Sequence, residues 1–154
     1  FGGVYKLAAV EDDAGNIIPK IKVSENTSKI TNPHFKKVLR YYDKESGKAL
    51  ADELCLYNEV VPQNEERTIF DPNATWKTKI LSDFTVRELL EPIFRGGELV
   101  YDLPSLPDIQ KYCKEQLRTL WDEVLRFENP HTYYVDLSRA LWDVKQELLA
   151  EAKK

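Results

Sequence analysis

The fold of this chain is decided by residues 38–56, which read VLRYYDKESGKALADELCL. Two runs rich in β-forming and apolar residues, 38–42 and 49–56, flank the short polar loop 43–48. Gly47 in this loop can adopt the positive φ that tight turns often require. The stretch therefore predicts a β-hairpin.

Shorter β-segments are expected before this hairpin. Residues 4–10 are rich in β-formers, and residues 12–16, DDAGN, have the composition of a tight turn. Residues 20–24 alternate, so that Ile21 and Val23 would face one side of a strand. The region up to about residue 56 is predicted to be strands joined by turns.

The segment 57–83 is predicted to be a loop with short extended pieces. Pro62 and Pro72 interrupt any long element, and the residues between them are largely polar. Trp76 and Ile80 are the expected apolar anchors of this loop.

A second hairpin is predicted farther along the chain. Residues 93–94 and 99–100 are apolar and flank the turn-forming sequence RGGE at 95–98. Residues 86–90 fit either a strand or a short helix.

The chain then changes to a helical pattern. Ser105 is a suitable N-cap, with Pro107 in the first turn and Asp108 placed to interact with the free amides of the helix start. Apolar residues recur after it at three- and four-residue spacing: Ile109, Tyr112, Cys113, Leu117, Leu120, Trp121, Val124 and Leu125. This predicts one helix that buries a face, including most of Trp121, and that ends before Asn129 and Pro130.

A last helix is predicted with Asp136 as its N-cap. Its apolar stripe comprises Leu137, Leu141, Val144 and Leu148. The predicted fold class is α+β: antiparallel strands and hairpins, then two C-terminal amphipathic helices packed on the strand layer. We expect a single domain, 1–154, that is strand-rich over 1–103 and helical over 104–154.

Composition limits the classes of function. The chain has 154 residues, 42% of them hydrophobic and 31% charged, and a formal net charge of -4. The acidic balance argues against nucleic-acid binding, and no apolar run approaches the roughly 20 residues needed to span a bilayer. We expect no membrane or nucleic-acid partner and a cytoplasmic location. The chain begins at Phe1 and contains no methionine, so we expect a C-terminal piece of a longer protein.

Catalytic and metal sites are not predicted. Cys55 and Cys113 lie in apolar patterns and are expected to be buried free thiols. His34 and His131 have no serine or cysteine nucleophile at a recognisable spacing, so each is expected to be a surface or packing residue. The glycine pairs match neither a Walker nor a Rossmann phosphate loop.

The candidate binding site is residues 19–33, PKIKVSENTSKITNP. Three lysines are combined there with hydroxyl and amide side chains around a turn, a chemistry suited to phosphate oxygens. Lys22 and Lys29 would supply charge, and Ser24 would supply a hydroxyl donor. The alternative is a solvent-facing strand and loop without a ligand.

Several segments together resemble the C-terminal region of bacterial nicotinate phosphoribosyltransferases. The segments are FGGVYKL (1–7), PKIKVSEN (19–26), KITNP (29–33), ELLEPIF (88–94), LPSL (103–106), LWDEV (120–124) and ENPH (128–131). Their order and spacing extend the resemblance over essentially the whole chain.

The resemblance implies a domain of a large cytoplasmic enzyme of NAD salvage. Such an enzyme is a pentosyltransferase that joins nicotinate to phosphoribosyl pyrophosphate, and it requires ATP and Mg²⁺. Its partners would be its own N-terminal and α/β barrel domains and the second subunit of a homodimer. Neither His34 nor His131 matches the phosphorylated histidine of that family, so the chain itself is expected to be inactive and without cofactor. Relatives often have glycine where this chain has His34, which puts in doubt a tight turn there.

Three functions remain open from the sequence. The first is a noncatalytic domain of the phosphoribosyltransferase, whose lysines reach phosphates at a site shared across the dimer, as in the related nicotinamide enzyme. The second is a scaffold and dimerisation domain without ligand contacts. The third is an independent phosphate- or RNA-binding module, which the acidic balance disfavours.

Overall fold

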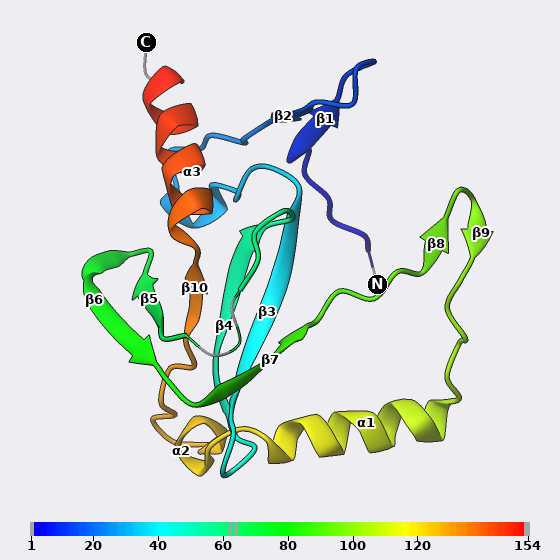
Figure 1. Ribbon diagram of the computed structural model, residues 1–154, viewed down its shortest axis with the longest axis vertical. Coiled ribbons are helices and arrows are strands. Elements are labelled where there is room, and N and C mark those ends of the chain that lie inside the picture. Colours follow the sequence, from blue (N-terminus) through cyan, green and yellow to red (C-terminus); the bar gives the residue numbers. More distant parts are fainter. Residues whose placement is uncertain (1, 62, 64, 153–154) are drawn as a thin grey trace.

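The centre of the molecule is a four-stranded sheet with strand order β10-β4-β3-β7 (Figure 1). The computed structural model describes residues 2–61, 63 and 65–152. The strands of this sheet are β3 (Lys36–Asp43), β4 (Ala49–Leu56), β7 (Phe84–Glu88) and β10 (Val135–Leu137). β3 is antiparallel to both β4 and β7, whereas β10 pairs in parallel with β4.

The predicted central hairpin is confirmed as β3 and β4. Its turn is closed by the Asp43 amide, which donates to the Lys48 carbonyl at 2.9 Å, and Gly47 has a φ of 68°. The side chain of Asp43 accepts hydrogen bonds from the amide and the hydroxyl of Ser46, at 2.7 and 2.6 Å. The polar loop therefore sets the turn, as its composition predicts.

One face of this hairpin forms the hydrophobic core. Tyr41 is fully buried, and its ring meets Phe84 of β7 edge to face at a centroid distance of 4.9 Å. The core cluster consists of Leu39, Tyr41, Ala51, Cys55, Ile69, Leu81 and Phe84. Cys55 is buried, as predicted.

The N-terminal strands are shorter than predicted. β1 (Ala9–Glu11) and β2 (Ile17–Pro19) pair around the expected turn, where Gly15 has a φ of 82°. The alternating residues 20–24 form no strand. The amide of Lys22 donates to the Thr31 side chain, and Val23 is half exposed, so this alternation has neither a neighbouring strand nor a buried face.

The prediction of a loop over 57–83 is wrong for much of that segment. β5 (Arg67–Asp71) and β6 (Ala74–Leu81) form an antiparallel hairpin, with Pro72 in its turn. Trp76 and Ile80 are exposed and are not its anchors; Ile69 and Leu81 are buried instead. Pro62, also used in that prediction, lies outside the described residues.

The following segment agrees with the sequence. Residues 84–88 are strand β7, which settles the choice left open for residues 86–90 in favour of a strand. β8 (Phe94–Arg95) and β9 (Glu98–Leu99) confirm the second hairpin, with positive φ at both turn glycines.

The first predicted helix begins where expected but ends earlier and buries no residue. α1 (Leu106–Arg118) starts after Ser105, whose Oγ lies 2.5 Å from Asp108 Oδ2. A separate short helix, α2 (Asp122–Leu125), follows it. Trp121 is 40% exposed and Cys113 is exposed, so the predicted burial of both is wrong. Of the predicted apolar stripe, Ile109, Tyr112, Cys113 and Leu117 lie on α1, and the other four residues lie beyond its end. No described segment covers the apolar side of α1.

The last helix, α3 (Arg139–Glu151), begins two residues later than predicted. Asp136 is part of β10, and Ser138 is the N-cap, with its Oγ accepting from the Leu141 amide at 3.2 Å. β10 is thus a strand inside the region predicted to be helical. The α+β class is otherwise confirmed, since the mostly antiparallel strands precede α1 and α3.

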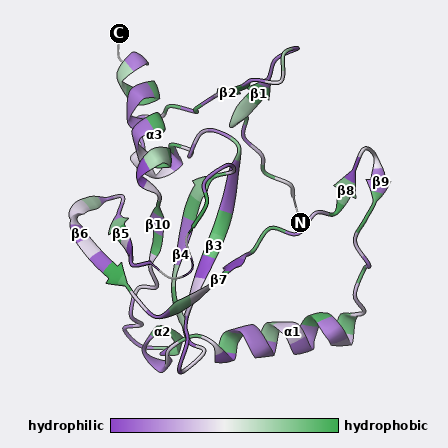
Figure 2. Cartoon of the chain, viewed as in Figure 1, coloured by the Kyte–Doolittle hydropathy of each residue, from purple (hydrophilic) through white to green (hydrophobic). Residues whose placement is uncertain are grey.

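The two long helices, α1 and α3, lie at opposite ends of the molecule and both carry hydrophobic and hydrophilic residues (Figure 2). α1 carries alternating hydrophobic and hydrophilic residues and runs along one edge of the molecule, whereas α3 stands at the opposite end, next to β10. Within the described residues, no helix has the length and apolar character needed to cross a membrane.

Candidate functional site

The residues predicted to bind phosphate lie on a closed loop, residues 20–34, here called the lysine loop. The backbone amides of Lys20 and His34 both donate to the carbonyl of Ala8, at 2.8 and 2.7 Å. The two ends of the loop therefore meet at one atom of the chain that precedes β1. This arrangement fixes the loop although it contains no strand.

The interior of the lysine loop is held by its own polar side chains. A short 3₁₀ helix, η1 (Thr27–Lys29), starts at Asn26, whose side-chain oxygen accepts from the amide and hydroxyl of Ser28. Ser24 Oγ accepts from the Asn26 amide at 3.3 Å. Ser24 thus has a structural contact, and its hydroxyl proton remains able to donate to a ligand.

The tight turn at His34 is formed although the residue is not glycine. Its φ is 74°, in the left-handed region, and its ring Nδ1 accepts from the Phe35 amide at 2.9 Å. Histidine tolerates this region better than β-branched residues do. The turn is therefore formed without glycine, and His34 has a structural contact there.

The cations around the lysine loop fall into two groups. Lys36 Nζ donates to the carbonyls of Pro33 and His34, and Lys145 Nζ of α3 donates to Asn32 at 2.8 Å. Burial lowers the pKa of Lys36 and the pKa of Lys145. These two lysines are used to hold the loop in place.

Lys22 and Lys29 form the second group. Both are exposed, and neither makes an ion pair with a carboxylate in the part of the chain that the structure describes. Ser24, which lies between these two lysines in the sequence, is half-buried. The loop therefore presents the ammonium groups of Lys22 and Lys29, together with that of the likewise exposed Lys20, and their charge suits an anion such as phosphate.

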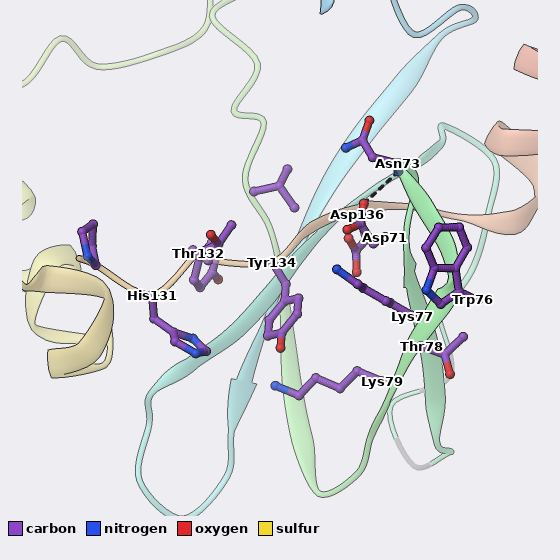
Figure 3. A pocket seen from close by; sticks show the side chains of 13 residues that line it. Asp71, Asn73, Trp76, Lys77, Thr78, Lys79, His131, Thr132, Tyr134 and Asp136 are labelled. Atoms are coloured by element: carbon purple, nitrogen blue, oxygen red, sulfur yellow. Dashed lines mark hydrogen bonds between the residues drawn. The ribbon is translucent and has the colours of Figure 1, made fainter.

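A second candidate site is a groove of about 1010 Å³ between β6 and the segment that leads into β10 (Figure 3). Its charged lining residues are Asp71, Lys77, Lys79 and Asp136, and His131 and Trp76 also line it. Lys79 Nζ lies over the ring of Tyr134, 4.7 Å from its centroid. The groove thus combines both signs of charge with aromatic surface.

Asp136 is a buried carboxylate of this groove with a raised pKa. It is only 4% exposed, and its burial, together with the negative charges of Asp71 and Glu53, raises its pKa to about 6. The positive charge of Lys79 lowers the pKa of Asp136 and so partly offsets this rise. No serine or cysteine is among the residues that line the groove, so His131 has neither of these two nucleophiles beside it there.

The sequence did not predict this groove. Its two walls come from residues 71–79 and 130–136, which only the β5–β6 hairpin and β10 bring together. The available signal was the composition of residues 74–81, ATWKTKIL, which is rich in β-formers.

Two ion pairs with buried carboxylates on β4 have a structural role. Arg40 Nε and Nη2 donate to both oxygens of Asp52, which also accepts from the hydroxyl of Tyr133. Arg67 makes the corresponding pair with Glu53, which also accepts from the hydroxyl of Tyr41 at 2.6 Å. Every charge in these pairs is matched, and neither includes a nucleophile.

The two histidines and two cysteines form no common centre among the described residues. Cys55 is in the core and Cys113 is on α1, while His34 lies in the lysine loop and His131 lines the groove. In the same residues, no group of three or more His, Cys, Asp or Glu side chains could hold a metal ion.

Comparison with known proteins identifies a family. A sequence model described as "Nicotinate phosphoribosyltransferase C-terminal domain" matches residues 35–145. The nicotinate phosphoribosyltransferase of Bacillus subtilis (strain 168) is 38% identical over 152 residues, which is 99% of this chain and 31% of that protein. The human nicotinate phosphoribosyltransferase is 33% identical over 150 residues, which is 97% of this chain and 27% of that protein.

A solved structure is similar as well. The crystal structure of human nicotinic acid phosphoribosyltransferase superposes with a TM-score of 0.69 and 28% identity, over 77% of this chain and 24% of that chain. The chain thus spans less than a third of the length of the relatives it matches.

Proposed function

Because the chain belongs to the family of nicotinate phosphoribosyltransferase C-terminal domains, we propose that it is the noncatalytic C-terminal part of such an enzyme. The full-length protein would form nicotinate mononucleotide from nicotinate and phosphoribosyl pyrophosphate, with ATP hydrolysis, in NAD salvage. It would be a cytoplasmic homodimer, in which this domain is joined to N-terminal and barrel domains. ATP and Mg²⁺ belong to the full-length enzyme, and we assign no metal ligand to this chain.

Within that enzyme, the lysine loop would bind phosphate oxygens of the nucleotide or of phosphoribosyl pyrophosphate. The observation that carries this role is the difference between the two groups of lysines. Lys36 and Lys145 are held by the fold, whereas Lys22 and Lys29 are exposed and make no ion pair with the described carboxylates. Ser24 would add a hydroxyl donor.

Enzyme assays test whether the full-length protein catalyses this reaction and whether residues 1–154 alone do not. The full-length enzyme, incubated with nicotinate, ATP, magnesium and phosphoribosyl pyrophosphate, should produce the mononucleotide, and residues 1–154 alone should not. Product from residues 1–154 above a heat-killed control would overturn the noncatalytic assignment. An inactive full-length enzyme would overturn the assigned reaction.

The phosphate role is tested by calorimetry on the full-length dimer. Charge-assisted contacts to phosphate are worth roughly 1.5–3 kcal/mol each, so Lys29→Ala should weaken binding of the phosphate ligand by about tenfold or more. Nicotinate affinity should not change. The double variant Lys44→Ala/Lys114→Ala removes the same charge elsewhere and serves as the control. Unchanged affinity for ATP and phosphoribosyl pyrophosphate in Lys22→Ala/Lys29→Ala would leave a scaffold domain.

A further inference from the structure

Helix α1 exposes its apolar stripe. Leu106, Ile109, Cys113 and Leu117 are spaced by three and four residues, so they share one face of the helix. Leu106 is 67% exposed, Ile109 48% and Leu117 47%, and Cys113 is exposed as well. We call these four residues the α1 face.

α1 contacts the sheet through residues that lie beside the α1 face and do not belong to it. Tyr42 of β3 donates to Gln116 at 3.4 Å, and the guanidinium of Arg87 lies 5.9 Å from the ring centroid of Tyr112. Lys48 Nζ donates to the carbonyl of Arg118 at the end of the helix. These contacts hold one side and the C-terminal end of α1 and leave the α1 face uncovered by the described chain.

A helix in this position needs a further packing partner. α1 has 13 residues and none of them is buried, and isolated helices of about this length are only marginally stable in water. The segment before it also exposes apolar side chains, with Phe94 65%, Leu99 53% and Leu103 75% exposed. Soluble monomers rarely expose large apolar patches, and such patches mark interaction sites.

The relatives and the course of the chain indicate what covers this surface. More than two thirds of the Bacillus subtilis relative lies outside the matched region, since this chain covers 31% of it. In Figure 1 the N-terminal end lies on the side of the molecule from which the β8–β9 hairpin projects. Val4 and Tyr5, near that end, are 86% and 91% exposed.

We propose that the α1 face is an intramolecular docking surface, covered by apolar residues of the polypeptide that precedes residue 1 in the full-length enzyme. The proposal rests on the proposed function, which supplies that preceding polypeptide. Docking would bury the stripe of α1 and fix the helix against a second apolar surface. The occupant is the same chain, and neither a second subunit nor another protein is required.

Cys113 reports directly on this contact. The native full-length enzyme would be treated with a maleimide, and labelling of each cysteine would be followed by peptide mass spectrometry. Cys113 should react at least about tenfold more slowly than in the urea-denatured enzyme, because a thiol must be accessible to react. Cys55, fully buried in the sheet core, is the internal standard for protection. Rapid labelling of Cys113 with Cys55 still protected would overturn the proposal.

Two matched variants test the surface itself. Ile109→Asp places a charge in the α1 face and should speed labelling of Cys113 without exposing Cys55. Lys114→Asp, elsewhere on the same helix, should leave the labelling of Cys113 slow. Equal rates in the two variants would contradict the proposal. If Ile109→Asp fails to fold, labelling of the unmodified enzyme still decides the question.

The remaining outcomes separate this proposal from the proposed function. Loss of Cys113 protection when the enzyme is diluted to monomers would assign the surface to a second subunit and overturn the intramolecular contact. An enzyme that forms nicotinate mononucleotide but leaves Cys113 reactive would overturn the docking alone. A protein with protected Cys113 and no such activity would support the docking and overturn the reaction.

Discussion

The guanidinium of Arg67 donates two hydrogen bonds to the carboxylate of Glu53, from Nε to Oε2 at 3.0 Å and from Nη2 to Oε1 at 2.8 Å. Arg67 lies on β5 and Glu53 on β4, so this pair joins the β5–β6 hairpin to the central sheet. Glu53 is 1% exposed, and it also accepts from the hydroxyl of Tyr41. Burial and the charge of Glu53 raise the pKa of Tyr41, which stays a neutral donor.

Arg67→Met should strongly destabilise the fold. The variant keeps an unbranched, flexible side chain but leaves the Glu53 carboxylate buried without its counter-charge, which costs about 3–5 kcal/mol. The free energy of unfolding, measured in urea, should fall by that amount. Adding Glu53→Gln should recover part of the loss, because the second change removes the unpaired charge.

Arg126→Met is the control for this measurement. Its ion pair with Glu123 is exposed and 3.8 Å long, and surface pairs of this kind contribute about 0–1 kcal/mol. Equal losses in Arg67→Met and Arg126→Met would show that the Arg67–Glu53 pair does not stabilise the fold.

Ser138→Ala should destabilise the start of α3. The Ser138 hydroxyl accepts from the Leu141 amide and donates to Glu59 Oε1 at 2.5 Å. Loss of an N-cap costs about 0.5–2 kcal/mol, and the lost hydrogen bond to Glu59 adds to it, although Glu59 Oε1 keeps its hydrogen bond from the Leu56 amide. Thermal unfolding followed by circular dichroism should show a lower midpoint. A midpoint equal to that of wild type would show that α3 does not depend on this cap.

Asp136→Asn should stabilise the protein at neutral pH. The pKa of Asp136 is raised to about 6 by burial, so the folded state holds a proton that the unfolded state releases near pH 4. The contribution of Asp136 to stability therefore decreases as the pH rises from about 4 to about 6. Removing the charge should gain about 2 kcal/mol at pH 7 and little at pH 4.

Urea denaturation at pH 4, 5, 6 and 7 checks this pH dependence. Asp102→Asn, a change at an exposed position, is the control and should leave the profile of wild type unchanged. A gain in Asp136→Asn of the same size at all four pH values would mean that the titration of Asp136 is not its cause.

His34→Val should destabilise the lysine loop. His34 has a φ of 74°, a region that β-branched residues strongly disfavour, so the substitution should cost about 1–3 kcal/mol. His34→Gly relieves this constraint and is expected to be tolerated. The two variants are compared by thermal unfolding and by calorimetric titration of the full-length enzyme with phosphoribosyl pyrophosphate. Equal stability of the two would exclude backbone strain at this turn.

Local signals in the sequence located several elements correctly. The 38–56 hairpin and the start of α1 at Ser105 depend on residues a few positions apart, whose turn and capping chemistry is complete within the segment. Lys22, Ser24 and Lys29 lie in one loop because they are close in the chain. Their contact with phosphate remains a prediction.

Other features could not be obtained from local patterns. Residues 67–81 form a hairpin although prolines and polar residues suggested a loop, because Ile69 and Leu81 find a place in the core formed by β3 and β4. Asp136 has the residue type of an N-cap but lies in β10, which pairs in parallel with a strand about 80 residues earlier. The groove between β6 and β10 depends on both of these elements.

The sequence by itself determined the class of fold, the central hairpin and the beginning of α1. The tertiary structure alone decided that Arg67 neutralises Glu53, that Ser138 is the N-cap of α3 and that no described segment covers the apolar face of α1. The physical reason is the range of the interactions. Turns, caps and helical periodicity act between neighbours in the chain, whereas burial and charge pairing depend on residues that only the folded chain brings together.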